Sequence, residues 1–277
     1  MDELTDAEHA ALVAALHTLQ RDLTTQLADT TGRTGTVSAD RMADFVRQEG
    51  LGVKWLLDTH VHADHLTATA YLKEKLGGVS AIGDGVTRIQ ETFADAFNLG
   101  GDFPRDGRQF DRLLAEGERL PLGEQEIECW HVPGHTPACA AYLVADAVFV
   151  GDTMFMPDYG SARCDFPGGD ARTLFRSVRR ILSLPPETRL FMCHDYKAPG
   201  RDEYKWETTV AEQRRRNPHL RDGISEEDFV AIREARDSEL SLPVLILPSV
   251  QVNMRAGHFP EPEDNGVSYL KIPLDTL

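Results

Sequence analysis

The sequence predicts an α/β fold in which two β-sheets lie face to face with helices outside, a four-layer sandwich. The main observation is the order of elements. Strand-like and helix-like segments alternate up to about residue 110, strand-like segments then cluster, and the alternation resumes after residue 150. A second observation is the length, because 277 residues can bury the core of one large α/β domain.

The composition is that of a globular protein, with 41% hydrophobic and 27% charged residues. The 29 basic and 45 acidic residues give a net charge of −16, which argues against nucleic acid or an anionic membrane as partner. No apolar run approaches the roughly 20 residues of a membrane span, and the first residues lack the layout of a secretory signal. The four cysteines show no C-x-x-C spacing, so we expect reduced thiols and a cytoplasmic protein.

The first thirty residues have a helical pattern. Thr5 and Glu8 have the spacing of a capping box, and leucines recur every three or four residues from Leu12 to Leu27. This helix either packs on the domain or forms a contact between subunits, so a homodimer is one expectation. We therefore expect an atypical N-terminal helix and loop over 1–36, a main domain over 37–240, and a C-terminal extension over 241–277 that packs on it.

The most informative stretch is Thr59-His-Val-His-Ala-Asp-His65, which follows an apolar strand predicted over 53–58. Side chains two apart on an extended segment share a side, so His60 and His62 can converge on one metal ion. Asp64 and His65, where the chain turns into a helix predicted from about 65 to 75, can reach a neighbouring position. The alternative is a polar helix start in which Asp64 is the N-cap.

Three later strand-like runs also end in residues that bind metals. His135 follows the run 126–132, Asp152 follows 147–150, and His194 follows 189–193. A single histidine after a strand is more often structural. Because α/β sheets build sites along the edge where strands end, these residues and the earlier cluster together predict one shared metal site.

The remaining pattern completes the expected elements. Further strands are predicted over 79–82, 110–115 and 140–144, and further helices over 38–46, 86–94, 170–184, 201–216 and 225–240. The tail over 243–277 is predicted to be irregular because prolines punctuate it.

The metal motifs resemble those of the metallo-β-lactamase superfamily over about residues 51–220. The resemblance implies an αββα sandwich in which His60, His62 and His135 surround one metal position. It places Asp64, His65 and His194 around a second position, with Asp152 between the two. Members normally begin with strands of the first sheet, whereas here a helix is predicted in their place.

The residues after Asp152 are similar to those of the persulfide dioxygenase branch, the ethylmalonic encephalopathy protein type, which is close to glyoxalase II. The similar stretches are Gly160–Phe166, His194–Tyr196, Phe166–Leu174 and Arg214–Pro218. The branch often has a cysteine where this chain has Ser161. The resemblance implies one Fe²⁺ per chain held by His60, His135 and Asp152. The residues His62, Asp64, His65 and His194 then surround the second position or support the first.

The same resemblance implies that the protein oxidises glutathione persulfide with O₂ to sulfite and glutathione. The glutathione moiety would contact Arg163, Tyr196 and Arg214, and arginine suits its carboxylates because the planar guanidinium binds them bidentately. One alternative is a hydrolase with two Zn²⁺ ions that cleaves a glutathione thioester or another small ester. Another is an inactive homologue that binds or senses. The number of ligands does not choose among the three.

Overall fold

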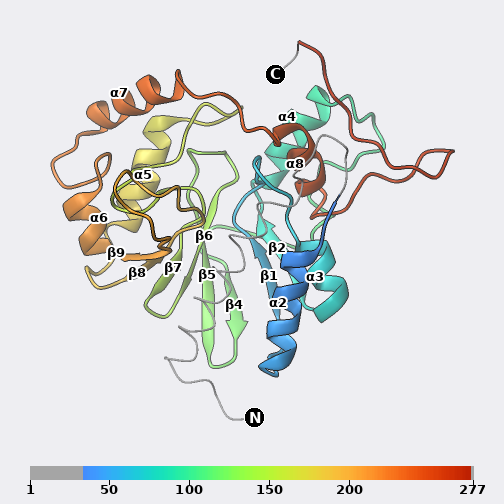
Figure 1. Cartoon of the computed structure of the whole chain (residues 1–277), viewed down its shortest axis with the longest axis horizontal. Helices are drawn as coiled ribbons and strands as arrows, with labels where there is room; N and C mark the ends of the chain where they lie inside the picture. Colours follow the sequence, from blue (N-terminus) through green and yellow to red (C-terminus); the bar gives the residue numbers. More distant parts are fainter. Residues whose placement is uncertain (1–33, 276–277) are drawn as a thin grey trace. The chain divides into compact units, whose positions relative to one another are not determined.

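The computed structural model describes residues 34–275, so the helix predicted over residues 1–30 lies outside the described part. The described chain forms helices and two β-sheets (Figure 1). It divides into two compact units. The smaller unit comprises 34–56, 62–80 and 243–272, and the larger unit comprises 57–61, 81–242 and 273–275. The domain boundaries expected from the sequence remain a prediction.

The smaller unit contains three helices: α2 (Val37–Gln48), α3 (Thr69–Leu76) and α8 (Ile246–Asn253). Helices α2 and α3 pack together through the buried side chains of Ala39, Ala43 and Leu72. The hydroxyl of Tyr71 in α3 also donates a hydrogen bond to the carboxylate of Asp40 in α2. Gly50 follows α2 with a positive φ of 64°, the left-handed conformation in which glycine commonly ends a helix.

The first sheet has the strand order β1 (Trp55–Asp58), β2 (Val79–Gly83), β3 (Arg112–Leu114) within the described residues. Strands β2 and β3 are parallel and are joined through helix α4 (Val86–Ala96). Ile82 and Leu114 are fully buried, as is Val86 at the start of α4. The strands predicted over 53–58, 79–82 and 110–115 are all present; β1 and β3 are shorter than predicted, and β2 is one residue longer.

The second sheet lies in the larger unit and has six strands in sequence order, mostly antiparallel (Figure 1). They are β4 (Arg119–Leu122), β5 (Gln125–His131), β6 (Ala140–Val144), β7 (Ala147–Phe149), β8 (Arg189–Phe191) and β9 (Glu207–Thr209). Strands β7 and β8 pair in parallel, and the connection between them contains helix α5 (Ala171–Ile181). Two of these strands, β4 and β9, do not correspond to strands predicted from the sequence.

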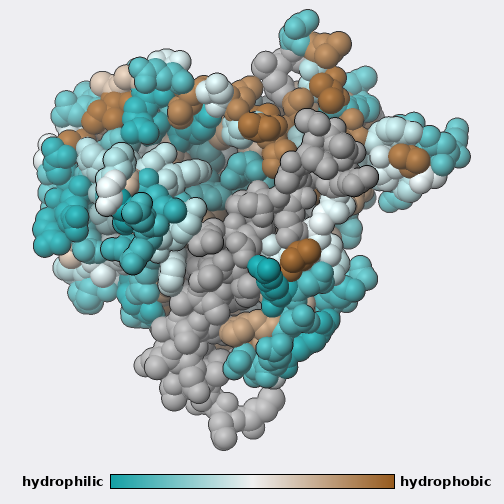
Figure 2. All heavy atoms as spheres, in the orientation of Figure 1, coloured by the Kyte–Doolittle hydropathy of each residue, from teal (hydrophilic) through white to brown (hydrophobic). Residues whose placement is uncertain are grey.

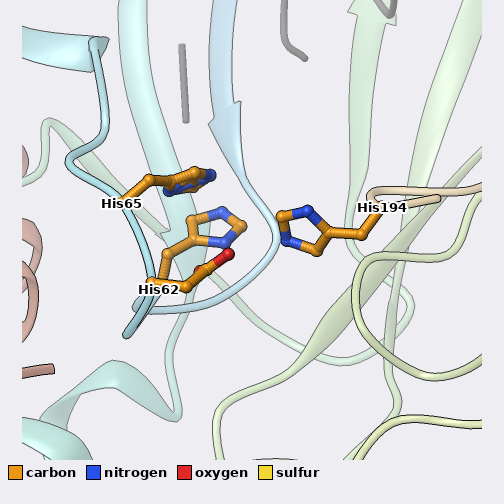
Figure 3. A group of neighbouring side chains, drawn as sticks. His62, His65 and His194 are labelled. Atoms are coloured by element: carbon orange, nitrogen blue, oxygen red, sulfur yellow. The ribbon is translucent and has the colours of Figure 1, made fainter. Parts of the chain in front are cut away.

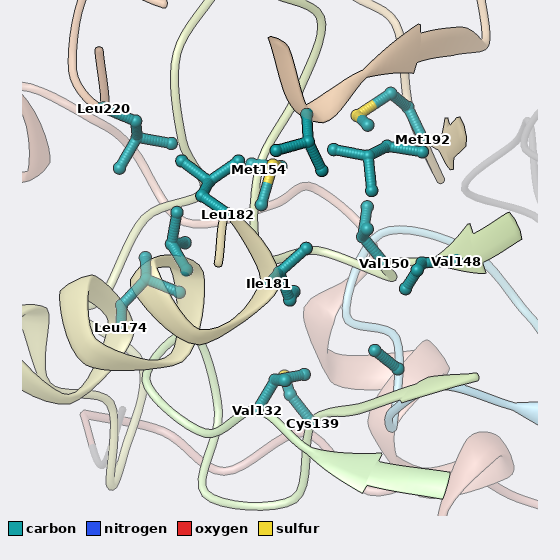
Figure 4. Close-up of a cluster of buried hydrophobic side chains, with 14 of the residues drawn as sticks. Val132, Cys139, Val148, Val150, Met154, Leu174, Ile181, Leu182, Met192 and Leu220 are labelled. Carbon is teal, nitrogen blue, oxygen red and sulfur yellow. The ribbon is translucent and has the colours of Figure 1, made fainter. Parts of the chain in front are cut away.

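The core of the larger unit lies between this sheet and α5 (Figure 4). Leu174 and Ile181 of α5 are fully buried with Val132 and Val148 from the sheet side. Full burial of each such aliphatic side chain contributes about 1.5–3 kcal/mol. Asp170 caps α5 by accepting a hydrogen bond from the Thr173 amide, so the predicted helix start is confirmed.

Helix α7 (Glu226–Asp237) also packs against α5. Its buried Phe229 lies with its ring centroid 5.5 Å from that of Phe175. Ser225 and Asp228 form a capping box, in which each side chain bonds to the other residue's backbone. Within the described residues, no helix is both long and apolar enough to cross a membrane. The surface over α6 (Val210–Arg216) and α7 is mainly hydrophilic (Figure 2).

Two helix boundaries differ from the sequence prediction. The helix predicted from about residue 65 begins only at Thr69, because residues 62–67 hold an irregular conformation. The helix predicted over 201–216 is only α6, which begins after β9. The preceding segment is tied into a loop because the Arg201 guanidinium donates hydrogen bonds to the carboxylates of both Asp158 and Asp195.

The tail is the third difference, because helix α8 lies where the sequence predicts irregular structure. Pro248 suggested a break, yet it is the third residue of α8. A proline is tolerated in the first turn of a helix because its missing N–H has no partner there in any case.

A substitution of Gly134 tests how tightly α5 packs on the segment that leads to His135. A Cβ atom on Gly134 would lie 2.3 Å from the backbone N and Cα of Leu174, and its φ is +137°. We expect Gly134→Ala to lower the free energy of unfolding by about 3 kcal/mol or more, measured by urea denaturation. The control is Gly123→Ala, which shares a positive φ but has nothing within 4 Å, and it should cost about 1 kcal/mol. Equal costs would show that the contact with Leu174 is not tight.

Candidate metal centre

Four of the expected ligands lie just beyond strand ends of the larger unit. His60 follows β1, His135 follows β5, Asp152 follows β7, and His194 follows β8. The end of β1 is joined to β6, because the Ala140 amide donates to the Thr59 carbonyl at 2.8 Å. The backbone therefore brings the residue before His60 against the second sheet.

His60, His135 and Asp152 form a buried group whose ligand atoms all lie within 4.8 Å of one another. The Nε2 atoms of His60 and His135 lie 3.8 Å and 3.9 Å from the same oxygen, Oδ2 of Asp152. Ligand atoms about 2.1 Å from one ion lie roughly 3.0–3.4 Å apart. Each of the two Nε2–Oδ2 distances therefore needs to shorten by only several tenths of an ångström for the histidine and Asp152 to share an ion.

Hydrogen bonds fix how the two histidine rings face Asp152. Nδ1 of His135 lies 2.8 Å from the backbone carbonyl of Arg163, which can only accept, so Nδ1 carries the proton. The lone pair of the neutral ring is then on Nε2, which faces the carboxylate. Nδ1 of His60 lies 3.0 Å from the Thr59 hydroxyl, and its Nε2 likewise faces Asp152. This arrangement of outer partners is typical of histidines that bind a metal.

The carboxylate of Asp152 indicates which kind of ligand suits the space between it and the rings of His60 and His135. Distances of 3.8–3.9 Å are too long for hydrogen bonds, and Oδ1 of Asp152 makes none within the described residues. A buried carboxylate is costly unless it is paired or binds a metal. A divalent cation between the carboxylate and the two Nε2 lone pairs satisfies all three, so the residues fit a metal ion.

His194 lies on the other side of the same carboxylate, with its Nε2 atom 3.6 Å from Oδ1 of Asp152. Cys193 joins these two in a second group with ligand atoms within 4.8 Å of one another. The sequence prediction did not place Cys193 in the site, although its position next to His194 was the available signal. The Asp195 carboxylate holds this loop, because it accepts from the Lys197 and Lys205 amides as well as from Arg201.

The other three expected ligands, His62, Asp64 and His65, lie in the smaller unit on the segment between β1 and α3. Their ligand atoms are also within 4.8 Å of one another. The ring centroids of His62 and His65 are 4.2 Å apart with an interplanar angle of 56°. Figure 3 shows these two rings on one segment, and it also draws His194 on its own loop.

Residues 31–194 match the metallo-beta-lactamase superfamily, which is more than half of the chain. The chain belongs to that superfamily. This confirms the family and the fold class predicted from the sequence.

Relatives in the superfamily carry different names. A probable metallo-hydrolase of Burkholderia pseudomallei is 59% identical over 89% of this chain and 87% of its own length. Glyoxylase B2 of Dictyostelium discoideum is 47% identical over 89% of this chain and 85% of its own. The mitochondrial persulfide dioxygenase ETHE1 of Mus musculus is 30% identical over 79% of this chain and 76% of its own.

Solved structures of superfamily members agree with this fold. The crystal structure of ETHE1 from Myxococcus xanthus has a TM-score of 0.65 and 30% identity, covering 80% of this chain and 85% of that one. A protein solved in a di-iron-bound form has a TM-score of 0.50 and 31% identity, covering 66% of this chain and 85% of that one.

The three residues expected to bind substrate are in different environments. Arg163 forms a bidentate ion pair with Asp165, which raises the pKa of the arginine, and it also donates to the Ser241 carbonyl. Arg214 lies on α6 and pairs with Asp222. Tyr196 is half exposed, and its ring stacks on that of Tyr159 at 5.0 Å. Their role in binding substrate stays a prediction.

A buried network supports the loop whose carbonyl holds His135. Arg233 of α7 donates to the Ser161 carbonyl and pairs with Asp237, and Asp237 in turn accepts from the Cys164 amide. Nδ1 of buried His219 accepts from the Ser161 amide at 3.1 Å. The side chains of α7 therefore fix the backbone on both sides of Arg163, although no pattern in the sequence indicated this role.

The titration of His219 tests that network. Burial, and then the positive charge of Arg233, lower the pKa of His219 from 6.5 to about 4. The folded state thus binds fewer protons than the unfolded state between these two pH values. The contribution of His219 to the free energy of unfolding is therefore complete above pH 6.5 and is lost as the pH falls towards 4. We expect the free energy of unfolding to fall by about 2 kcal/mol through this histidine when the pH is lowered from 7.5 to 5.

The wild type is compared with His219→Asn, in which the asparagine oxygen can still accept a hydrogen bond from the Ser161 amide but the side chain does not titrate. Urea denaturation of the metal-free protein should show a smaller fall between pH 7.5 and pH 5 in this variant than in the wild type. The control is His258→Asn at an exposed position, which should keep the wild-type slope. An unchanged slope in His219→Asn would contradict the assignment.

Proposed function

We propose that the protein is an iron-dependent persulfide dioxygenase that oxidises glutathione persulfide with O₂ to glutathione and sulfite. The observation that carries the proposal is the buried set of two imidazoles and one carboxylate: His60, His135 and Asp152. In the reaction, one persulfide, one O₂ and one water give one thiol, one sulfite and two protons. The terminal sulfur loses four electrons, and O₂ gains them.

The ligand set supports one-metal chemistry. Two histidines and one carboxylate are the set by which non-haem enzymes hold Fe²⁺ with coordination positions left open. Bound there, ferrous iron would supply the redox chemistry that a reaction with O₂ requires. The three residues all belong to the larger unit, so that unit by itself carries a complete set.

The surrounding residues have defined tasks in this proposal. The Arg163 carbonyl keeps the Nδ1 proton of His135 and thereby leaves Nε2 as the ligand atom. The Thr59 hydroxyl holds Nδ1 of His60 by a hydrogen bond, and the Nε2 atom of that ring faces Asp152. Burial of both rings keeps bulk water from competing for the site.

Glutathione would approach over Tyr196, whose ring centroid lies 5.8 Å from that of His194. The phenol and the stacked Tyr159 offer a partly exposed aromatic surface for the peptide. With a net charge of −16, the chain needs local cations to bind carboxylates, and Arg163 and Arg214 are the proposed ones. Binding at Arg163 would require a substrate carboxylate to replace Asp165 in its ion pair.

A hydrolase with two Zn²⁺ ions is the second candidate. All seven residues expected to serve two metals are present, and relatives at 59% and 47% identity are named as a metallo-hydrolase and a glyoxylase. Such a centre would cleave a glutathione thioester or another small ester. An inactive binding homologue is the third candidate.

The test is to purify the protein without oxygen, measure its metals, and follow O₂ uptake with glutathione persulfide. We expect about one iron per chain and uptake of one O₂ for each sulfite formed. Two zinc ions per chain with thioester cleavage and no O₂ uptake would contradict the proposal. The absence of bound metal and of both activities would favour the inactive homologue.

The control variants are His135→Ala and Arg180→Ala. The first removes a ligand and should abolish both iron binding and O₂ uptake. The second removes a surface arginine that pairs with Glu116, and it should keep both.

A further inference from the structure

The segment that carries His62, Asp64 and His65 is irregular, so its backbone groups lack the partners that a helix would provide. One side chain from the C-terminal part of the chain supplies them. Asn253, the last residue of α8, is 3% exposed and belongs to the same compact unit. Its Nδ2 donates to the carbonyls of His62 at 2.8 Å and His65 at 2.7 Å, and its Oδ1 accepts from the Thr67 amide at 2.8 Å.

The three partners fix the orientation of this amide. Backbone carbonyls only accept and a backbone N–H only donates, so the nitrogen and oxygen of Asn253 cannot exchange places. Both amide protons are used, and each joins a carbonyl of a residue expected to bind metal. The two carbonyls bracket Asp64 in the chain, so one side chain fixes the backbone at both ends of the cluster.

The C-terminal part of the chain is in turn built to hold Asn253. Ile246, Val250 and Val252 are buried and anchor α8. After the helix, Gly257 has a φ of +89°, and a Cβ atom there would lie 3.2 Å from the Thr67 carbonyl. The chain therefore approaches the 62–67 segment closely at a second point.

We propose that Asn253 is a positioning residue for the His62–Asp64–His65 cluster and makes it a second, weaker position for a divalent cation. The C-terminal extension thereby contributes to the metal centre without providing a ligand. Removal of such an outer partner typically costs 10- to 100-fold in metal affinity. The inference goes beyond the proposed function, because it concerns the binding of a cation and not the reaction.

Helix α8 offers a matched control in Gln251, which is 1% exposed. Its Nε2 donates to the carbonyls of Leu247 and Lys271, and its Oε1 accepts from the Lys271 amide. Gln251 thus makes the same three kinds of bond as Asn253, two residues earlier, but to backbone outside the cluster. Asn253→Asp and Gln251→Glu remove the same donors and add the same charge.

The experiment titrates Co²⁺ into the metal-free full chain and determines the dissociation constant of each bound ion by competition with a chelator. We expect the wild type to bind two ions. Asn253→Asp should raise the dissociation constant of the weaker-bound ion at least tenfold and that of the tighter-bound ion less than threefold. Gln251→Glu should leave both constants within threefold, although thermal unfolding should show that both variants are less stable than the wild type.

Asn253→Ala, which removes the donors without adding a charge, should show the same selective loss and is used if Asn253→Asp does not fold. The proposal is overturned if the wild type binds only one Co²⁺, if both constants change equally, or if neither changes. Because the readout is Co²⁺ binding, a failure to consume O₂ with persulfide would contradict the proposed function and leave this inference standing.

Discussion

Asp152 places a carboxylate in the interior of the larger unit, where it faces the Nε2 atoms of His60 and His135. A charge in such a place is stable only when an opposite charge compensates it. The distances exclude direct hydrogen bonds to the two histidines, so a cation shared by the three groups is the arrangement that balances the cost. Much of the nearby structure serves to hold these groups in place.

The support comes mainly from backbone groups and distant side chains. The Arg163 carbonyl sets the tautomer of His135, and α7 fixes the loop that carries this carbonyl through Arg233 and Asp237. At Gly151, a Cβ atom would lie 2.9 Å from the Thr59 side chain, so this glycine lets the strand end before Asp152 approach the residue that holds His60. Rigid support of this kind is what keeps ligand atoms within reach of one ion.

The sequence indicated which candidate ligands lie close together, because they form a local motif and follow apolar strand-like runs. It predicted less well where distant contacts decide the local structure. The helix expected from residue 65 begins at Thr69, because the carbonyls of His62 and His65 bond to Asn253 and not along a helix. That partner lies 188 or more residues away in the chain, a relation that one sequence does not reveal.

Two further helices differ from the sequence prediction, the first because of a distant contact and the second because of a local feature. Helix α6 is shorter than its polar pattern predicted because Arg201 pairs with two aspartates and ties the preceding segment into a loop. Helix α8 was missed because Pro248 was interpreted as a break, although its place in the first turn costs no hydrogen bond. Arg163, which is predicted to contact the substrate, pairs with Asp165 in the structure, and its role in binding stays a prediction.

The central claim is that His60, His135 and Asp152 hold a single iron ion. X-ray absorption spectroscopy at the iron edge, on protein purified without oxygen, tests it most directly. In protein that contains one iron per chain and no added metal, so that the weaker cation position stays empty, the account predicts nitrogen and oxygen ligands with an imidazole contribution and no metal neighbour. A metal neighbour at about 3.5–4 Å, the spacing of a two-metal site, would contradict it.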